Sequence, residues 1–197
     1  MTGHPIDDYE AELRQFVPRR IVDLNPDKQA QTVAGLVVNM RTMKNKRGDT
    51  MAFLLLDDRT ARIEVALFSD VYEECRDKLV KDAVLVVEGV CSFDEYSGGK
   101  KMRVKSLRSL AEAREHHARE LELLIESEHS SAEQLQRLKS ALGSVRGGNC
   151  PVVIRYRRPE GEARLRLSGD WRILPQEDVL IRLREDCGAN NVVIKYD

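Results

Sequence analysis

The side chains best able to do chemistry in this sequence are basic residues at two turns and the aromatic residues near them. The first basic group lies in and beside the segment KNKRGD at 44–49, and the second follows the segment SGG at 97–99. The two groups comprise Arg41, Lys44, Lys46 and Arg47, and then Lys100, Lys101, Arg103, Lys105 and Arg108. Lysine and arginine bind phosphate groups and aromatic rings stack on nucleobases, so these residues offer the chemistry of strand binding.

Five β-rich segments and one helix are predicted to position these turns. The strands are expected over residues 32–43, 51–56, 61–68, 83–91 and 100–107. The apolar run MAFLLL at 51–56 predicts a strand that is buried on both faces. A helix is expected to start at Asp70, with Asp70 as its N-cap and Glu73 at the third position. Three strands, a helix and two strands form the order of an OB-fold, a small barrel that binds oligonucleotides.

The two basic groups fall on the turns after the first and fourth strands, which flank the binding face of an OB-fold. Phe68, Phe93 and Tyr96 lie where they would reach this face. Each feature alone also has a simpler interpretation, because basic turns are often only solvated and Phe68 also suits a core. Their coincidence on one face favours the binding of single-stranded DNA. The predicted DNA-binding residues are Arg41, Lys44, Lys46, Arg47, Phe68, Tyr96, Lys100, Lys101, Arg103 and Lys105.

No pattern for catalysis or for metal binding is present in the sequence. There is no phosphate-binding glycine loop, no GxSxG and no HExxH. The four cysteines form no CxxC pair. Asp57 and Asp58 are adjacent at a turn, where neighbouring side chains point apart. We therefore expect no catalytic residue, no metal and no cofactor in this chain.

Charge and hydropathy limit the classes of protein that fit. The formal net charge is -1, and residues 31–110 hold 14 basic and 12 acidic side chains, so any basic surface must be local. No apolar run reaches the roughly 18 residues of a membrane span. The first residues, MTGHPIDDYEAE, are polar and acidic, which is not typical of a secretory signal. We expect a cytoplasmic protein without a membrane partner.

The last third of the sequence predicts a second, smaller α/β unit. Strands are expected over 120–126, 151–157, 162–168 and 191–196, with a loop at 147–149 and helices before the second strand and before the last. The order strand, helix, strand, strand, helix, strand is that of a split βαβ domain. The fold class is therefore α+β, a five-stranded OB-fold barrel followed by a small βαββαβ domain. The predicted domains are a helical appendage (1–30), the barrel (31–112) and the α/β domain (113–197).

Two features of this second unit suit partner binding. Arg155, Arg157, Arg164 and Arg166 alternate along the predicted hairpin, which indicates either a solvated face or a surface for an acidic partner. Trp171 is the only tryptophan, and it either covers the local core or anchors a protein partner, since tryptophan is enriched at interface hot spots.

Several segments resemble the C-terminal region of the bacterial replicative DNA polymerase III alpha subunit. They are TGHP at 2–5, AGLVV at 34–38, LDDRTARIEVALFSD at 56–70, SFDEYSGGKKMR at 92–103 and the pair Trp171-Arg172. The resemblance implies that the chain is a non-catalytic fragment of a DNA-directed DNA polymerase. It implies that the barrel handles single-stranded template and that the last domain binds the tau subunit of the clamp loader. The catalytic aspartates and the motif that binds the sliding clamp would lie upstream of this chain.

The resemblance also assigns residues to the partner surface. Trp171 and the last strand, with Val193, Ile194 and Tyr196, correspond to the region that contacts tau. Two other hypotheses stay open. In the first, the barrel is an RNA-reading appendage, like the OB-type anticodon-binding domain of an aminoacyl-tRNA synthetase. In the second, the barrel is a spacer whose outer face is blocked by residues 1–30.

Overall fold

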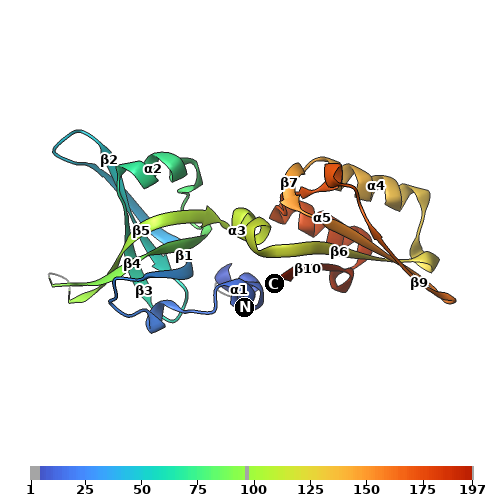
Figure 1. Cartoon of the computed structure of the whole chain (residues 1–197), viewed down its shortest axis with the longest axis horizontal. Coiled ribbons are helices and arrows are strands. Elements are labelled where there is room, and N and C mark those ends of the chain that lie inside the picture. The colour runs from blue at the N-terminus through green and yellow to red at the C-terminus, as the bar shows by residue number, and fades with distance from the viewer. Residues whose placement is uncertain (1–4, 96–97, 197) are drawn as a thin grey trace. The chain divides into compact units, whose positions relative to one another are not determined.

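The computed structural model describes residues 5–95 and 98–196. These residues fold into two compact units, the first ending at Leu110 and the second beginning at Ala111 (Figure 1). The predicted α+β class is confirmed, with a five-stranded barrel followed by a smaller βαββαβ unit. No helix in the described part of the chain is both long and apolar enough to cross a membrane.

The first unit is a closed barrel whose strands hydrogen-bond in the order β1-β2-β3-β5-β4. β1 pairs with both β2 and β4 and so closes the barrel, while β3 and β5 run parallel. The strands are β1 (Ala30–Lys44), β2 (Thr50–Asp57), β3 (Arg62–Leu67), β4 (Val84–Asp94) and β5 (Gly99–Ser109). The helical elements are η1 (Pro5–Tyr9), α1 (Glu10–Phe16), η2 (Ile21–Asp23), α2 (Ser69–Cys75) and η3 (Arg76–Lys78).

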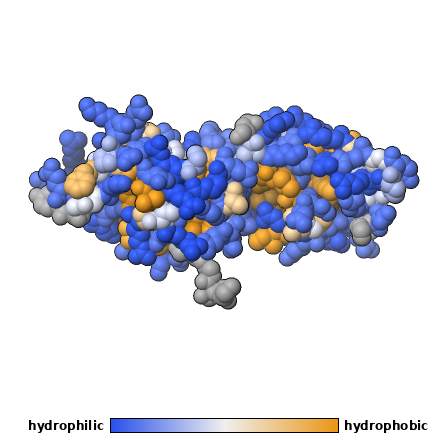
Figure 2. Space-filling model, turned by 90° about the horizontal axis from the view of Figure 1, so that it is seen from below, coloured by the Kyte–Doolittle hydropathy of each residue, from blue (hydrophilic) through white to orange (hydrophobic). Residues whose placement is uncertain are grey.

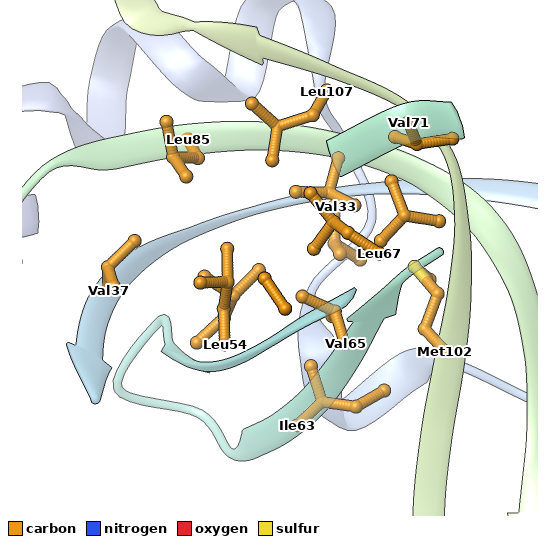
Figure 3. Packing of buried hydrophobic residues seen from close by; sticks show 14 of the residues in the cluster. Val33, Val37, Leu54, Ile63, Val65, Leu67, Val71, Leu85, Met102 and Leu107 are labelled. Carbon is orange, nitrogen blue, oxygen red and sulfur yellow. The ribbon is translucent and has the colours of Figure 1, made fainter. Parts of the chain in front are cut away.

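Alternation of apolar and polar residues builds the barrel interior. In β3 the side chains of Ile63, Val65 and Leu67 are buried, while the alternate residues Arg62 and Glu64 are exposed. A strand points successive side chains to opposite faces, so each strand contributes one apolar row to the interior. Figure 3 shows the resulting core, formed by Val33, Val37, Leu54, Ile63, Val65, Leu67, Val71, Leu85, Met102 and Leu107.

The prediction that the run at 51–56 is buried on both faces is wrong. Ala52, Leu54 and Leu56 are fully buried in the barrel, but Phe53 and Leu55 are only partly buried on its outer side. A barrel has one interior, so a strand in it buries one face there unless another element covers the other face. The apolar run therefore places an aromatic ring and a leucine on the outer surface.

Strands β4 and β5 approach closely at Gly89. A Cβ atom at this position would lie 2.3 Å from the carbonyl oxygen of Arg103 and 2.8 Å from the Cγ of Met102. The pairing of the two strands shifts register between Glu88 and Gly89, as at a β-bulge. Glycine permits this approach, and beyond it Arg103 pairs with Val90.

The segment before β1 packs into the same unit. Ile21 and Leu24 are buried and belong to the barrel core. The backbone N–H of Ile21 donates to Oδ2 of Asp58 over 2.8 Å, and Lys100 Nζ donates to the carbonyl oxygens of Val22 and Leu24. These bonds attach the segment to the turn after β2 and to the start of β5.

The start of the barrel helix differs from the sequence prediction. The helix α2 begins at Ser69, its N-cap residue is Phe68, and no side chain caps it. Asp70 lies inside the first turn and is exposed, so the predicted capping box of Asp70 and Glu73 is wrong. The carboxylate of Asp70 makes no hydrogen bond or ion pair to any residue that the structure describes.

The second unit contains a four-stranded sheet, a short further strand and three α-helices among its described residues. Its elements are α3 (Leu110–His117), β6 (Ala118–Glu126), η4 (Ser127–His129), α4 (Ala132–Gly143), β7 (Arg146–Cys150), β8 (Val152–Arg158), β9 (Gly161–Arg166), η5 (Gly169–Trp171), α5 (Glu177–Cys187), η6 (Ala189–Asn191) and β10 (Val192–Tyr196). The loop predicted at 147–149 lies instead in β7, which bridges to Ile173 through Arg146 and Cys150.

The sheet order of this unit is β10-β6-β8-β9. β6 and β8 are parallel neighbours, so no strand separates them as one would in a split βαβ arrangement. Both edge strands, β10 and β9, pair antiparallel with their neighbours. One face of the sheet forms a core with residues of α4 and α5, among them Leu121, Leu123, Leu138, Leu180 and Leu183.

Candidate nucleic-acid interface

Five outward residues form one row across the strands of the barrel. Arg41 of β1 pairs with Phe53 of β2, Phe53 pairs with Ala66 of β3, Ala66 pairs with Arg103 of β5, and Arg103 pairs with Val90 of β4. Neighbouring strands lie about 4.8 Å apart, so the row crosses the outer face at right angles to the strands. The register thus brings two arginines and a phenylalanine from distant sequence positions onto one line.

Each arginine of this row lies over a phenylalanine ring. The guanidinium carbon of Arg41 is 4.4 Å from the centroid of Phe53, and that of Arg103 is 4.6 Å from the centroid of Phe68. Such cation–π contacts hold the guanidinium plane over the aromatic face. A nucleobase has a π-face that stacks on either group, so each Arg–Phe pair is a candidate stacking platform.

The charges on this face are unevenly neutralised. Arg41 makes an ion pair with Glu64 over 3.1 Å, and both side chains are well exposed. Arg103 and Lys105 make no ion pair within the described residues. Exposed pairs such as Arg41–Glu64 contribute little free energy, so a phosphate competes with Glu64 for Arg41 at small cost.

The hairpin between β1 and β2 ends in a turn that presents three further cations. The turn is closed by Asn45, whose backbone N–H donates to the carbonyl of Asp49 and whose side-chain amide donates to Asp49 Oδ2, both over 2.9 Å. The one carboxylate of the turn is thereby used within it. Lys44, Lys46 and Arg47 are exposed and have no ion-pair partner among the described residues.

The cations of the β4–β5 turn are used differently. Lys100 donates to the carbonyl oxygens of Val22 and Leu24, and Lys101 makes an ion pair with Asp94 over 3.1 Å. Tyr96, which was predicted to reach DNA, lies outside the described residues. Sequence proximity had grouped Lys100 and Lys101 with Arg103, but the structure gives them protein partners.

A groove of about 490 Å³ adjoins the row at the Arg103–Phe68 pair. Apolar, hydroxyl, basic and acidic groups all contribute to its wall. Its lining residues are Phe68, Asp70, Val71, Val90, Ser92, Arg103, Val104 and Lys105. The groove therefore joins an aromatic ring and two cations to a carboxylate that has no hydrogen bond or ion pair within the described residues.

The second unit has an apolar groove of about 270 Å³ beside Trp171. Its lining combines the sheet residues Leu123, Ile125 and Ile154 with Leu135, Leu138, Lys139 and Leu142 of α4 and with Leu167 and Trp171. Trp171 is partly buried, and the guanidinium of Arg146 lies 4.5 Å from its ring centroid. Leu135 is exposed at the rim.

The other face of this sheet is a network of ion pairs. Glu120 and Glu122 of β6 are buried beneath basic side chains of the neighbouring strands. The pairs are Arg155–Glu122, Arg155–Glu162, Arg157–Glu126, Arg157–Glu162, Arg164–Glu120, Arg166–Glu120, Lys195–Glu120 and Lys195–Glu122. The arginines of the hairpin are thus neutralised within the sheet, which disfavours the hypothesis of an acidic partner at this face.

Comparison with known proteins identifies relatives of this chain. Residues 31–110 match the model of an OB-fold nucleic acid binding domain, and residues 137–188 match the model of the DNA polymerase III subunit alpha, C-terminal domain. All of the chain aligns with the DNA polymerase III subunit alpha of Pseudomonas fluorescens at 42% identity and of Escherichia coli (strain K12) at 38%. Over its whole length the chain is therefore similar to part of the DNA polymerase III alpha subunit.

The chain spans 17% of the length of these alpha subunits. Among solved structures, the second OB-fold domain of replication protein A from Methanococcus maripaludis is 21% identical, with a TM-score of 0.36. That alignment covers 47% of this chain and 95% of that domain.

The structure of the present chain brings only some of the predicted DNA-binding residues together. Arg41, Phe68, Arg103 and Lys105 share the outer face or its groove, and Lys44, Lys46 and Arg47 lie at the adjacent hairpin tip. Phe53 was missed by sequence reasoning. The register of β1 and β2 was the signal, since a hairpin turn at 45–49 places Arg41 opposite Phe53.

The residues predicted to contact a protein partner do not form one surface in the structure. Trp171 lines the apolar groove, whereas Ile194 packs against the core and Val193 lies exposed at the neighbouring strand position, which points to the opposite sheet face. Tyr196 is partly buried at the end of β10. Within the described residues no group of three or more His, Cys, Asp or Glu side chains is placed to hold a metal ion.

Hydrophilic residues cover most of the face drawn in Figure 2, and apolar residues are exposed there in separate patches. The exposed large apolar side chains of this alpha-subunit relative include Phe68 beside the barrel groove and Leu135 beside the Trp171 groove. Phe93 and Leu165 are also exposed but line neither groove. Phe93 therefore serves as a control for the role of Phe68, and Leu165 serves as a control for the role of Leu135.

Proposed function

We propose that this chain is a non-catalytic module of a replicative polymerase that holds single-stranded template DNA on the outer face of its barrel. The observation that supports this most strongly is the row Arg41–Phe53–Ala66–Arg103, whose two arginines lie over the rings of Phe53, within the row, and Phe68, beside it. Next to the row is a hairpin tip with three cations that have no ion-pair partner among the described residues. Stacking platforms beside a basic track are how sequence-tolerant single-strand binders work.

The outer face is available for a strand. The described hydrogen bonds of the segment before β1 lead to the turn after β2, to the start of β1, to the carbonyl of Cys91 in β4 and to Lys100. None of them leads to Phe53 or Arg103. This argues against the hypothesis of a spacer whose face is blocked. Binding is expected to be weak and dependent on salt, because few cations release few counterions.

Titration of a labelled oligo-dT into the whole chain at low salt tests the proposal. We expect saturable binding that weakens about tenfold or more when Lys44, Lys46 and Arg47 are changed to Ala together. Absence of binding to the unaltered chain would refute the single-strand role. Equal binding by the triple variant would remove the hairpin tip from the site.

RNA reading is the second candidate for the barrel. The family model that matches residues 31–110 is one whose name refers to tRNA anticodon binding. Competition between folded tRNA and oligo-dT separates the candidates, because a module that holds template DNA should prefer the oligo-dT. A preference for tRNA would favour an RNA-reading appendage instead.

We further propose that the second unit docks the tau subunit of the clamp loader at the Trp171 groove. An apolar groove rimmed by a partly buried tryptophan and an exposed leucine has the composition of an interface hot spot. The resemblance assigns the sliding clamp to a motif outside this chain, and neither groove is proposed as its site.

Size-exclusion chromatography with the C-terminal region of tau tests the docking role. Leu135→Glu places a charge at the groove rim and should abolish co-elution, and Trp171→Ala should weaken it. Leu165→Glu makes the same change at an exposed position of β9 that does not line the groove, so it should leave co-elution intact. Co-elution of Leu135→Glu at the unaltered level would exclude this groove as the docking site.

A further inference from the structure

The groove at the end of the Arg–Phe row has features that a purely sequence-tolerant platform does not need. Phe68 supplies an exposed aromatic face, and Arg103 lies over that ring. Lys105 and the hydroxyl of Ser92 lie on the same wall. The volume of about 490 Å³ lies within the range typical of small-molecule pockets and is ample for one nucleobase with its sugar.

Asp70 is the unexpected member of this wall. A carboxylate repels the phosphates of a bound strand, so backbone binding alone does not explain it. Its charge suits the first turn of α2, but it caps no helix and makes no hydrogen bond or ion pair within the described residues. Its two oxygens are acceptors only, and they are left to accept hydrogen bonds from a ligand.

The four DNA bases differ in the donors that they offer to such a carboxylate. Guanine presents two adjacent donors, N1–H and N2–H, which match the two carboxylate oxygens. Adenine and cytosine each offer one amino group beside a ring acceptor, and thymine offers one N–H between two carbonyls. Bases of a single strand are free to be read on this edge, and a good bidentate contact discriminates strongly between bases.

We propose that the groove lined by Phe68, Asp70, Arg103 and Lys105 is a guanine-selective subsite of the strand-binding face. The base stacks on Phe68, the carboxylate of Asp70 accepts hydrogen bonds from guanine N1–H and N2–H, and Lys105 binds the adjoining phosphate. This inference rests on the proposed binding of single-stranded DNA. It adds a base preference at one position to a face that otherwise tolerates any sequence.

Fluorescence anisotropy with the whole chain and three oligonucleotides of about 12 nucleotides tests it, a length within the range of OB-fold sites. The first is oligo-dT, the second has one central guanine, and the third has hypoxanthine at that position, which lacks the N2 amino group. We expect the guanine strand to bind about tenfold more tightly than oligo-dT and the hypoxanthine strand to be intermediate.

Asp70→Asn and Asp77→Asn are the matched variants. Both remove one negative charge from an exposed position of the same helical segment, but Asp77 lies in η3, after the end of α2, and does not line the groove. Asp70→Asn should abolish the preference for guanine and keep the binding of oligo-dT, because the amide presents a donor where N1–H or N2–H approaches. Asp77→Asn should keep the preference.

The outcomes separate the two proposals. Equal affinity for the guanine strand and oligo-dT would overturn the guanine subsite and leave the single-strand role standing. A guanine preference that survives Asp70→Asn, or that Asp77→Asn also removes, would likewise overturn it. Absence of binding to all three strands would overturn both proposals together.

Discussion

The guanidinium carbon of Arg103 lies 4.6 Å from the ring centroid of Phe68, at the point where β3 ends and β5 passes beside it. The same relationship recurs on the other side of Ala66, where Arg41 lies 4.4 Å from the centroid of Phe53. The two pairs face outward because the residues adjacent to the two rings in sequence point inward. Leu54 follows Phe53 and Leu67 precedes Phe68, and both leucines are buried in the barrel. An interior packed in period two thus places both pairs on the exterior, where we propose that the strand binds.

The first prediction concerns the rings. Phe53→Leu and Phe68→Leu keep apolar volume but remove the aromatic face, so each should weaken the binding of oligo-dT by about five- to fiftyfold. Phe93→Leu makes the same change at an exposed position of β4 that lies outside the row, and it should have little effect. Anisotropy titrations measure all three. If Phe93→Leu weakened binding as much as Phe53→Leu, the strand would follow a different path across the barrel.

The second prediction concerns salt. Each phosphate contact to a single strand contributes about 0.7 to the slope of log affinity against log salt concentration. Lys44→Ala with Lys46→Ala removes two such contacts and should therefore reduce this slope by about 1.4. Lys28→Ala with Lys81→Ala removes the same charge from exposed positions outside the hairpin tip, and it should change the slope little. Equal changes in the two double variants would mean that only net charge matters.

The third prediction concerns Lys100, which the sequence grouped with the DNA-binding cations. Its ammonium donates to the carbonyl oxygens of Val22 and Leu24, so Lys100→Ala should lower the free energy of unfolding by about 1 kcal/mol. The midpoint of thermal unfolding should fall by roughly 4 °C, while the affinity for oligo-dT stays nearly unchanged.

Lys101→Ala is the comparison for Lys100→Ala. Lys101 makes only an exposed ion pair with Asp94, and such pairs contribute little to stability. Its removal should leave the unfolding midpoint nearly unchanged. A loss of DNA affinity in Lys100→Ala without a loss of stability would restore the assignment made from sequence.

The barrel was predictable because its signal is local. The alternation of apolar residues at Ile63, Val65 and Leu67 predicts a strand, and so does the apolar run around Leu54. Neither prediction requires knowledge of the neighbouring strand in the sheet. The α+β class, the element order and the position of the first basic turn follow from such patterns. The side of the barrel that Phe53 faces depends on the register of β1 and β2, which requires the length of the hairpin turn.

Other parts of the site depend on contacts between distant residues. The sequence around Lys100 does not reveal that carbonyls more than seventy residues away accept from its ammonium. Asp70 at the start of a helix fits the capping pattern, yet the chain enters α2 one residue earlier and Phe68 becomes the N-cap residue. The arginines of β8 and β9 similarly show no partner in sequence, because their carboxylates come from β6.

The last prediction concerns Glu122, which is buried between Lys195 of β10 and Arg155 of β8. Burial raises the pKa of this carboxyl, but the hydrogen bonds from Lys195 and Arg155 together outweigh it and hold the pKa below its ordinary value of 4.5. A carboxyl whose pKa is lower in the folded state stabilises the fold above its unfolded-state pKa. This stabilisation is lost as the pH falls through the folded-state pKa.

Glu122→Gln should therefore lower the free energy of unfolding by about 2 kcal/mol at neutral pH, where the unaltered carboxylate accepts charge-assisted hydrogen bonds. The difference between the variant and the unaltered chain should shrink as the pH falls well below 4.5, because protonation of Glu122 then leaves the unaltered side chain as neutral as the glutamine. Glu126→Gln is the control, since its pair with Arg157 is more exposed and should contribute less at every pH. Denaturant unfolding followed across the pH range measures the three proteins. A constant difference between Glu122→Gln and the unaltered chain at all pH values would mean that the side chain stabilises the sheet by packing rather than by charge.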